Sequence, residues 1–308
     1  MSINLEPTPY DGTGAASKKW WPSRYGAGDQ LGAGNELNSD RTLEGIRSVQ
    51  QGRVIELGRE LHPAVPAFDP RAWQQLILAH GTLEDLWLDK GATDVSFFEE
   101  SVWQSYQIGT HLDALGHLGI AGRFYNGTPY AEFYDPHGLT KLGIEHVRPW
   151  VGRGVLLDVA GVLGGPLDEG FVITAEHLNA AEAKADVIVG AGDAVLVNTG
   201  WGRLWAADPG RYASGQPGIG WEGAHWLTAR RVSLVGADNS SFEPRPFERE
   251  AFSWAVHQHL LAETGTYILE NIDLAELVTA VTSTFLFILS PIKTRGSTAS
   301  MVAPLAVI

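Results

Sequence analysis

Short apolar segments that alternate with helical patterns place the strongest constraint on how this chain can fold. Five such segments span residues 154–159, 194–199, 232–237, 267–271 and 284–289. Each is a short apolar run bounded by turn residues, which is the pattern of a buried strand. Helical patterns cover residues 174–185, 222–231 and 247–263, and the last one stops before Gly265, a residue suited to a left-handed helix cap. Strands that alternate with helices predict an α/β protein.

The amino-terminal half predicts further elements and a mixed sheet. A helix is expected to start after Ser39 and to end at Gly52, followed by a strand over residues 53–61. Several glycine-bounded strands precede residue 160, so antiparallel pairs should accompany the parallel ones. No repeat or low-complexity linker divides the sequence, and we therefore expect one domain over residues 1–308. Within it, residues 1–38 form an aromatic and glycine-rich amino-terminal arm.

Composition excludes several classes of function. The chain has no cysteine, so any metal must be held by imidazole, carboxylate or amide oxygen rather than by sulfur. Its formal net charge of −14 argues against binding to nucleic acid or to an anionic membrane surface. No apolar stretch approaches the roughly 20 residues of a membrane-spanning helix, and the first residues lack the pattern of a signal peptide. We therefore expect a cytoplasmic protein.

Residues 102–113 carry the polar side chains that point most directly to chemistry. If this segment is one strand, its side chains alternate between two faces, and the odd positions form a polar face. His111 and Asp113 on that face stand roughly 7 Å apart along the chain and can reach toward one ion with bonds of about 2.0–2.2 Å. Gln107 lies on the same face, two steps earlier. His117 follows a short turn and can stand beside the metal without being a ligand.

An alternative interpretation of the His-x-Asp pattern needs no metal. Such a pair often lies on the surface, or the carboxylate simply satisfies the histidine. The surroundings favour the metal, because glutamine, histidine and aspartate here stand in an apolar neighbourhood. Burying such groups without partners would cost about 1–3 kcal/mol each, so something polar must meet them.

The same segment resembles a known family signature. Gln107-x-Gly-Thr-His111-x-Asp113-x-x-x-His117 is similar to the His-x-Gly-Thr-His-x-Asp-x-x-x-His motif of the putative cyclase family, which contains bacterial kynurenine formamidase, isatin hydrolase and related cyclic amide and lactone hydrolases. The resemblance runs from about Trp20 to the carboxyl terminus and is strongest toward the longer-chain branch. It continues through residues 124–127, 153–158, 234–240, 268–271 and 291–296. It implies a mixed, barrel-like sheet flanked by helices, in the swivelling β/β/α arrangement.

The resemblance also implies roles for individual residues. His111 and Asp113 match metal ligands, and His117 matches the residue that moves the proton. Glu270 matches a carboxylate ligand. A histidine ligand precedes Leu260-Leu261 in the family, where His257 fits best and His259 is the rival.

Gln107 is the main departure from the family pattern, because the binuclear formamidases carry histidine at that position. An amide oxygen is a weaker, neutral ligand than imidazole, so its presence should weaken a second metal position and favour harder ions. We therefore expect one divalent ion rather than two, either Mn²⁺ or Zn²⁺.

These features predict a hydrolase in which a metal activates water and His117 acts as general base and then acid. The expected substrate is a cyclic amide (a lactam or imide) or a formamide. A lactone hydrolase, a cyclase or dehydratase, and a non-catalytic binder of a small carboxylic acid are the alternatives. Trp20, Trp21 and Tyr25 form either an aromatic wall over a ring substrate or a loop packed on the core. The resemblance further implies a homodimer or homotetramer.

Overall fold

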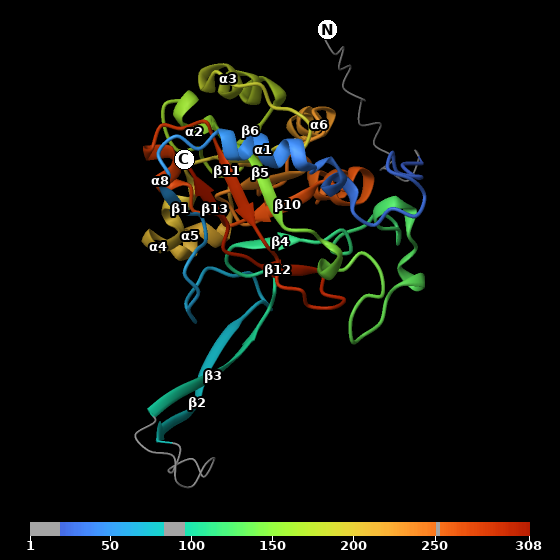
Figure 1. The fold of residues 1–308 in the computed structure, drawn as a ribbon, viewed down its shortest axis with the longest axis vertical. Helices are drawn as coiled ribbons and strands as arrows, with labels where there is room; N and C mark the ends of the chain where they lie inside the picture. Colours follow the sequence, from blue (N-terminus) through green and yellow to red (C-terminus); the bar gives the residue numbers. More distant parts are fainter. Residues whose placement is uncertain (1–18, 83–95, 251–252) are drawn as a thin grey trace.

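A mixed nine-stranded sheet forms the centre of the molecule in the computed structural model, which describes residues 19–82, 96–250 and 253–308 (Figure 1). Its strand order is β1-β13-β11-β5-β7-β9-β10-β4-β12. The sheet curls into a half-barrel and stays open, because β1 and β12 lie at its two ends. The α/β class and the mixed, barrel-like sheet expected from the sequence are confirmed.

Four parallel strands occupy the middle of this sheet. They are β5 (Trp150–Asp158), β7 (Ala194–Asn198), β9 (Leu234–Ala237) and β10 (Tyr267–Glu270). Every residue of β7, β9 and β10 is buried. Helices cover parallel strands on their faces, which is why these strands read as continuous apolar runs in the sequence.

Antiparallel strands extend the sheet on both sides. Next to β5 lie β11 (Thr284–Leu289), β13 (Leu305–Val307) and β1 (Val54–Glu56). Next to β10 lie β4 (His111–Asp113) and β12 (Ala299–Met301). The strand that carries the His-x-Asp motif is therefore flanked by partners on both edges.

Helices connect the strands and cover the sheet. The α-helices are α1 (Ser39–Arg47), α2 (Val159–Val162), α3 (Ala175–Ala185), α4 (Leu204–Ala207), α5 (Pro209–Ser214), α6 (Trp221–Ala229), α7 (Ala255–His257) and α8 (Ala275–Thr279). Shorter helical segments are η2 (Gly32–Glu36), η3 (Tyr125–Gly127), η4 (Tyr130–Glu132), η5 (Ile144–His146), η6 (Trp201–Arg203) and the π-helix η8 (Gln258–Thr264). The helices expected over residues 174–185 and 222–231 are thus confirmed as α3 and α6.

The first helix and strand are shorter than the sequence predicts. Helix α1 ends at Arg47 rather than at residue 52, because the amide of Ser48 bonds to the carbonyls of both Glu44 and Gly45 and tightens the last turn. Strand β1 covers three residues, since β13, its strand neighbour in the sheet, is equally short.

The helix expected over residues 247–263 begins later than predicted. Before it, Trp254 has a φ of 65°, a left-handed conformation that does not continue into a right-handed helix. From Ala255 the chain forms α7 and then η8, up to Gly265, which has a φ of 69° and caps the helix as expected. Residues 251–252 lie outside the described part of the chain. The helical turn that carries His257 is present, but the helix covers only about the second half of the expected span.

The expectation of a single strand over residues 102–113 is wrong. Strand β3 (Ser96–Gln104) ends where its partner β2 (Trp73–Thr82) begins, and one further backbone bond, from the Ser105 amide to the Ala72 carbonyl, closes this ladder. The chain then turns through Gly109, at a φ of 58°, and enters the nine-stranded sheet as β4. Strands β2 and β3 form a separate hairpin that projects from the body of the molecule (Figure 1).

Candidate metal centre

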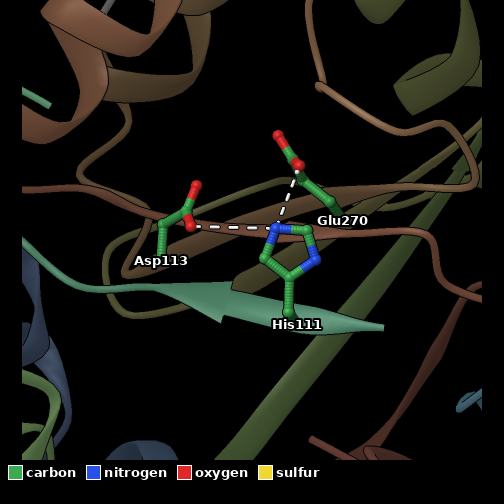
Figure 2. A group of neighbouring side chains, drawn as sticks. All are labelled: His111, Asp113 and Glu270. Carbon is green, nitrogen blue, oxygen red and sulfur yellow. Dashed lines mark ion pairs between the residues drawn. The ribbon is translucent and has the colours of Figure 1, made fainter. Parts of the chain in front are cut away.

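Strand register brings His111 and Glu270 together. Strand β4 pairs antiparallel with β10, and in that ladder His111 lies opposite Glu270. Directly opposite residues have Cβ atoms about 4.5–5.5 Å apart, so both side chains reach the same space. Asp113 lies two residues along β4 and therefore projects from the same face as His111. Figure 2 shows the two carboxylates flanking the imidazole.

The distances among these three side chains suit a metal ion. His111 Nε2 lies 3.2 Å from Glu270 Oε2 and 3.8 Å from Asp113 Oδ1. Ligands about 2.1 Å from a tetrahedral ion stand roughly 3.4 Å from one another, which is close to these separations. Within residues 19–82, 96–250 and 253–308, this trio is the one group of three or more His, Asp or Glu side chains with ligand atoms mutually within 4.8 Å.

Three of the ligand atoms are buried without a hydrogen-bond partner. They are His111 Nε2 and both carboxylate oxygens of Asp113. Leaving such atoms unsatisfied is costly, and native proteins do so rarely. The other nitrogen of His111, Nδ1, donates to the carbonyl of Gly109 at 2.8 Å, which turns Nε2 and its lone pair toward the carboxylates. The donor set therefore fits a divalent cation.

His257 approaches the same carboxylates from α7. Its Nε2 lies 3.2 Å from Glu270 Oε1 and 4.0 Å from Asp113 Oδ2. Its Nδ1 lies 2.6 Å from Glu243 Oε1, and its backbone N–H donates to the same oxygen at 3.1 Å. Glu243 thus holds His257 by one bond to the ring and one to the backbone and directs Nε2 to the centre, the arrangement of a carboxylate–histidine–metal triad.

His259 lies in different surroundings. Its Nδ1 is 2.7 Å from Glu263 Oε2, and its Nε2 is 2.9 Å from the hydroxyl of Thr228. Its ring stacks on that of His225, with centroids 3.9 Å apart. Of the two candidates on this helix, His257 is the one that the fold directs to the carboxylates.

His117 stands at the more open side of the centre. Its side chain is 23% exposed, whereas those of His111, Asp113 and Glu270 are nearly inaccessible. Its Nε2 lies 3.9 Å from Asp113 Oδ2. This distance places a ring nitrogen beside the centre, where it can exchange a proton with a substrate.

Gln107 reaches His117 and Thr298. Its Nε2 lies 3.3 Å from His117 Nδ1 and donates to Thr298 Oγ1 at 2.9 Å. Because β3 ends at Gln104, Gln107 does not share a strand face with His111, contrary to the alternation argument. Its assignment as a metal ligand stays a prediction.

Electrostatics couple the histidines to the carboxylates. Burial alone would raise the pKa of Glu270, but the neighbouring rings of His111 and His257 outweigh burial and lower that pKa to about 2. Burial alone would lower the pKa of His257, but Glu243 and Glu270 raise it to about 10. For His117, burial dominates and lowers the pKa. Burial alone would lower the pKa of His111, but Glu270 and Asp113 raise it.

The aromatic residues of the amino-terminal arm make structural contacts. The ring of Trp21 lies against Gly127 and under the guanidinium of Arg123, 5.0 Å from the centroid. The hydroxyl of Tyr25 donates to Glu36. Trp20 packs edge-on against Trp21, with ring centroids 4.8 Å apart. These contacts favour a loop packed on the core, and a substrate-binding role for Trp20, Trp21 and Tyr25 stays a prediction.

Three supporting residues were not among the site residues predicted from the sequence. Glu243 holds His257, and Thr298 accepts from Gln107. Asn271 donates to the carbonyl of Gly109 at 2.8 Å, the same oxygen that holds His111. Only Asn271, beside Glu270 in the segment that resembles the family, gave a signal that could have identified it.

Comparison with known proteins identifies the family. The sequence model described as a putative cyclase matches residues 55–244, more than half of the chain. The chain belongs to this family. A solved structure of a novel cyclase is 30% identical with a TM-score of 0.83, and the alignment covers 93% of this chain and 98% of that chain. A comparison with curated proteins found no match.

Less similar solved structures share the fold. Isatin hydrolase A from Ralstonia solanacearum is 19% identical with a TM-score of 0.61, over 82% of this chain and 91% of that chain. A predicted metal-dependent hydrolase from Bacillus stearothermophilus is 17% identical with a TM-score of 0.54, over 82% of this chain and 97% of that chain. Among the described residues, no helix combines the length and apolar character needed to cross a bilayer.

Proposed function

We propose that this cyclase-family protein is a metal-dependent hydrolase that cleaves the C–N bond of a cyclic amide or a formamide. The observation that carries the proposal is the convergence of His111 Nε2 and both oxygens of Asp113, all buried and without hydrogen-bond partners, on the carboxylate of Glu270. The fold shared with isatin hydrolase A, whose substrate contains a cyclic amide, supports the substrate class.

One divalent ion, Mn²⁺ or Zn²⁺, is proposed for this centre. His111, Asp113, Glu270 and His257 would hold it, with two imidazole nitrogens and two carboxylates. Both ions accept this mixed nitrogen and oxygen donor set. The two carboxylates would neutralise the charge of a single divalent ion, which supports one ion rather than two.

The chain's own residues account for proton movement. A divalent ion would polarise the substrate carbonyl and acidify the attacking water. His117, whose pKa burial lowers, is neutral at pH 7 and takes the proton of that water at Nε2. It then returns the proton to the leaving nitrogen. Its partial exposure at the rim of the centre gives the substrate access to this nitrogen.

A substrate panel tests the reaction. Lactams, imides, formamides and lactones should be supplied to the metal-loaded protein, and turnover of an amide class with little turnover of lactones is expected. Preferential turnover of lactones would instead indicate that the protein cleaves an ester bond and not a C–N bond. Absence of turnover, together with ligand-dependent shifts in melting temperature, would indicate a binder of small acids.

Metal dependence is tested separately. Protein purified without added metal should contain about one equivalent of Mn²⁺ or Zn²⁺ by elemental analysis, and exhaustive chelation should abolish turnover. Full turnover after chelation would overturn the proposed function.

We also propose that the protein is a homodimer or homotetramer and lies in the cytoplasm. Exposed apolar side chains on the β2–β3 hairpin support an oligomer: Leu76 is 64% exposed, Phe98 76% and Trp103 62%. Large exposed apolar groups are typical of surfaces that meet another protein. Sedimentation analysis tests the oligomer, and a monomer at micromolar concentration would contradict it.

A further inference from the structure

The side chain of Gln107 is held away from the ligand cluster. Its amide group contacts Thr298 and His117, and its backbone carbonyl accepts a hydrogen bond from Arg71 at 2.9 Å. In the described part of the chain, no hydrogen bond joins Gln107 to His111. The Nε2 of His111 has no hydrogen-bond partner, so the amide of Gln107 does not bond to it. Both the backbone and the side chain of Gln107 are thus engaged elsewhere.

The two ring nitrogens of His117 have separate surroundings. Nδ1 faces the amide of Gln107 at 3.3 Å, while Nε2 faces Asp113 at 3.9 Å. The backbone N–H of His117 donates to the carbonyl of Ala114 at 3.0 Å, which fixes the start of the side chain. Nε2 is therefore the nitrogen that faces the centre, and Nδ1 is the nitrogen that the protein holds.

For Nε2 of His117 to accept a proton, the neutral ring must carry its own proton on Nδ1. The oxygen of the Gln107 carboxamide accepts from that Nδ1–H when the end group is turned by 180°, and the Thr298 hydroxyl, which both donates and accepts, can bond to either end of the amide. The amide thereby selects the tautomer that leaves Nε2 free to take a proton.

We infer that Gln107 is a positioning residue for His117, anchored by Thr298, and does not bind the metal. The position at which the family motif has a metal-binding histidine thus serves here to orient the proton-transfer group. The inference rests on the proposed function for the role of His117, but the contacts on which it depends are independent of any reaction.

A measurement of metal binding tests whether Gln107 positions His117 or binds the metal. Chelated protein should be titrated with Mn²⁺ and with Zn²⁺ in a calorimeter, comparing Gln107→Met, a side chain of similar length without the amide, with His111→Ala. We expect Gln107→Met to change the Kd by less than about threefold. Loss of the His111 ligand should weaken metal binding by more than about 100-fold, a larger loss than is expected from changing a residue that contacts a ligand but not the metal. A loss of about tenfold or more in Gln107→Met would overturn the inference.

Nuclear magnetic resonance of the metal-free protein tests positioning directly. With ¹⁵N-labelled histidine, the ring signals of His117, assigned with His117→Asn, report which nitrogen carries the proton. We expect a single neutral tautomer in the wild type and a mixture of two in Gln107→Met. Unchanged His117 signals in Gln107→Met would contradict the inference.

Thr298 provides a matched pair of variants. Thr298→Val removes the hydroxyl that anchors the amide, and we expect a smaller shift of the His117 signals in the same direction. Thr298→Ser keeps the hydroxyl and should recover most of the wild-type spectrum. Equal spectra for the two variants would argue against the anchor. A protein that binds no metal and hydrolyses nothing would overturn the proposed function, yet these spectra would still decide the role of Gln107.

Discussion

His257 and His259 stand two residues apart on one helical turn, and both are buried, yet their surroundings differ. Both ring nitrogens of His259 have protein partners, Glu263 and Thr228. The Nδ1 of His257 is held by Glu243, while its Nε2 faces the carboxylates of Glu270 and Asp113. Both ring nitrogens of His259 are therefore satisfied, whereas near His257 the oxygens of Asp113 have no donor.

This difference shows what distinguishes a candidate site from a packed cluster. Burial and nearby carboxylates are common to both histidines. Only the first cluster leaves ligand atoms unsatisfied at separations that a single ion would bridge. Unsatisfied buried ligand atoms therefore distinguish the cluster around His257 from the one around His259, whereas residue type and burial do not.

The largest expected effect comes from removing the most unsatisfied ligand. Asp113→Ala should lose its metal and at least about 10³-fold in kcat/KM, because several kcal/mol of transition-state stabilisation depend on the ion. Elemental analysis and the substrate panel measure both losses. Glu263→Gln, in the second cluster, should stay within about twofold of wild type. Equal losses in both variants would remove the distinction between the clusters.

Substitution of each histidine tests the comparison directly. His257→Ala should weaken metal binding by about 100-fold, whereas His259→Ala should keep its metal and lose about 1–3 kcal/mol in the free energy of unfolding, because Glu263 loses its partner. Calorimetric titration and urea unfolding measure the two quantities. The reverse pattern would make His259 the helix ligand.

Glu243 should have a smaller effect on the metal. Glu243→Gln keeps an oxygen for the His257 ring but removes the negative charge that makes the imidazole a better ligand, so metal affinity should fall about 10-fold. The same titration measures it. Unchanged affinity would show that Glu243 contributes to packing alone.

The pH dependence of metal-free stability should show the broadest effect, because several groups contribute to it. His257 has a raised pKa of about 10, so its contribution is complete below the unfolded value of 6.5 and is lost as pH rises through about 10. Glu270 has a lowered pKa of about 2, so its contribution is present above 4.5 and is lost as pH falls through about 2. The lowered pKa of His117 also removes stability as pH falls below 6.5.

Together these shifts predict a maximum of stability near pH 6.5 for the chelated protein. Urea unfolding across the pH range measures it. Metal-loaded protein should instead gain stability above that pH, because the ion requires unprotonated histidines. Identical pH profiles with and without metal would show that no ion binds to these side chains.

The sequence predicted the sheet more reliably than the segment around the motif. The parallel strands were evident because each is a continuous apolar run, as in β7 and β9. The prediction of one strand over residues 102–113 was wrong because the alternation of apolar and polar residues continues across a turn that only Gly109 marks. Likewise, the helical pattern over residues 247–263 does not reveal that Trp254 adopts a left-handed conformation.

By itself the sequence determined the α/β class, the absence of sulfur ligands and the His-x-Asp pair, because these depend on residue type and local periodicity. Tertiary structure alone placed Glu270 opposite His111, since strand register depends on which strands meet. It alone directed His257 rather than His259 to the carboxylates, because Glu243 holds one ring and Glu263 the other. It also brought Gln107 to His117 and Thr298, contacts between residues 10 and 191 positions apart, which local periodicity does not encode.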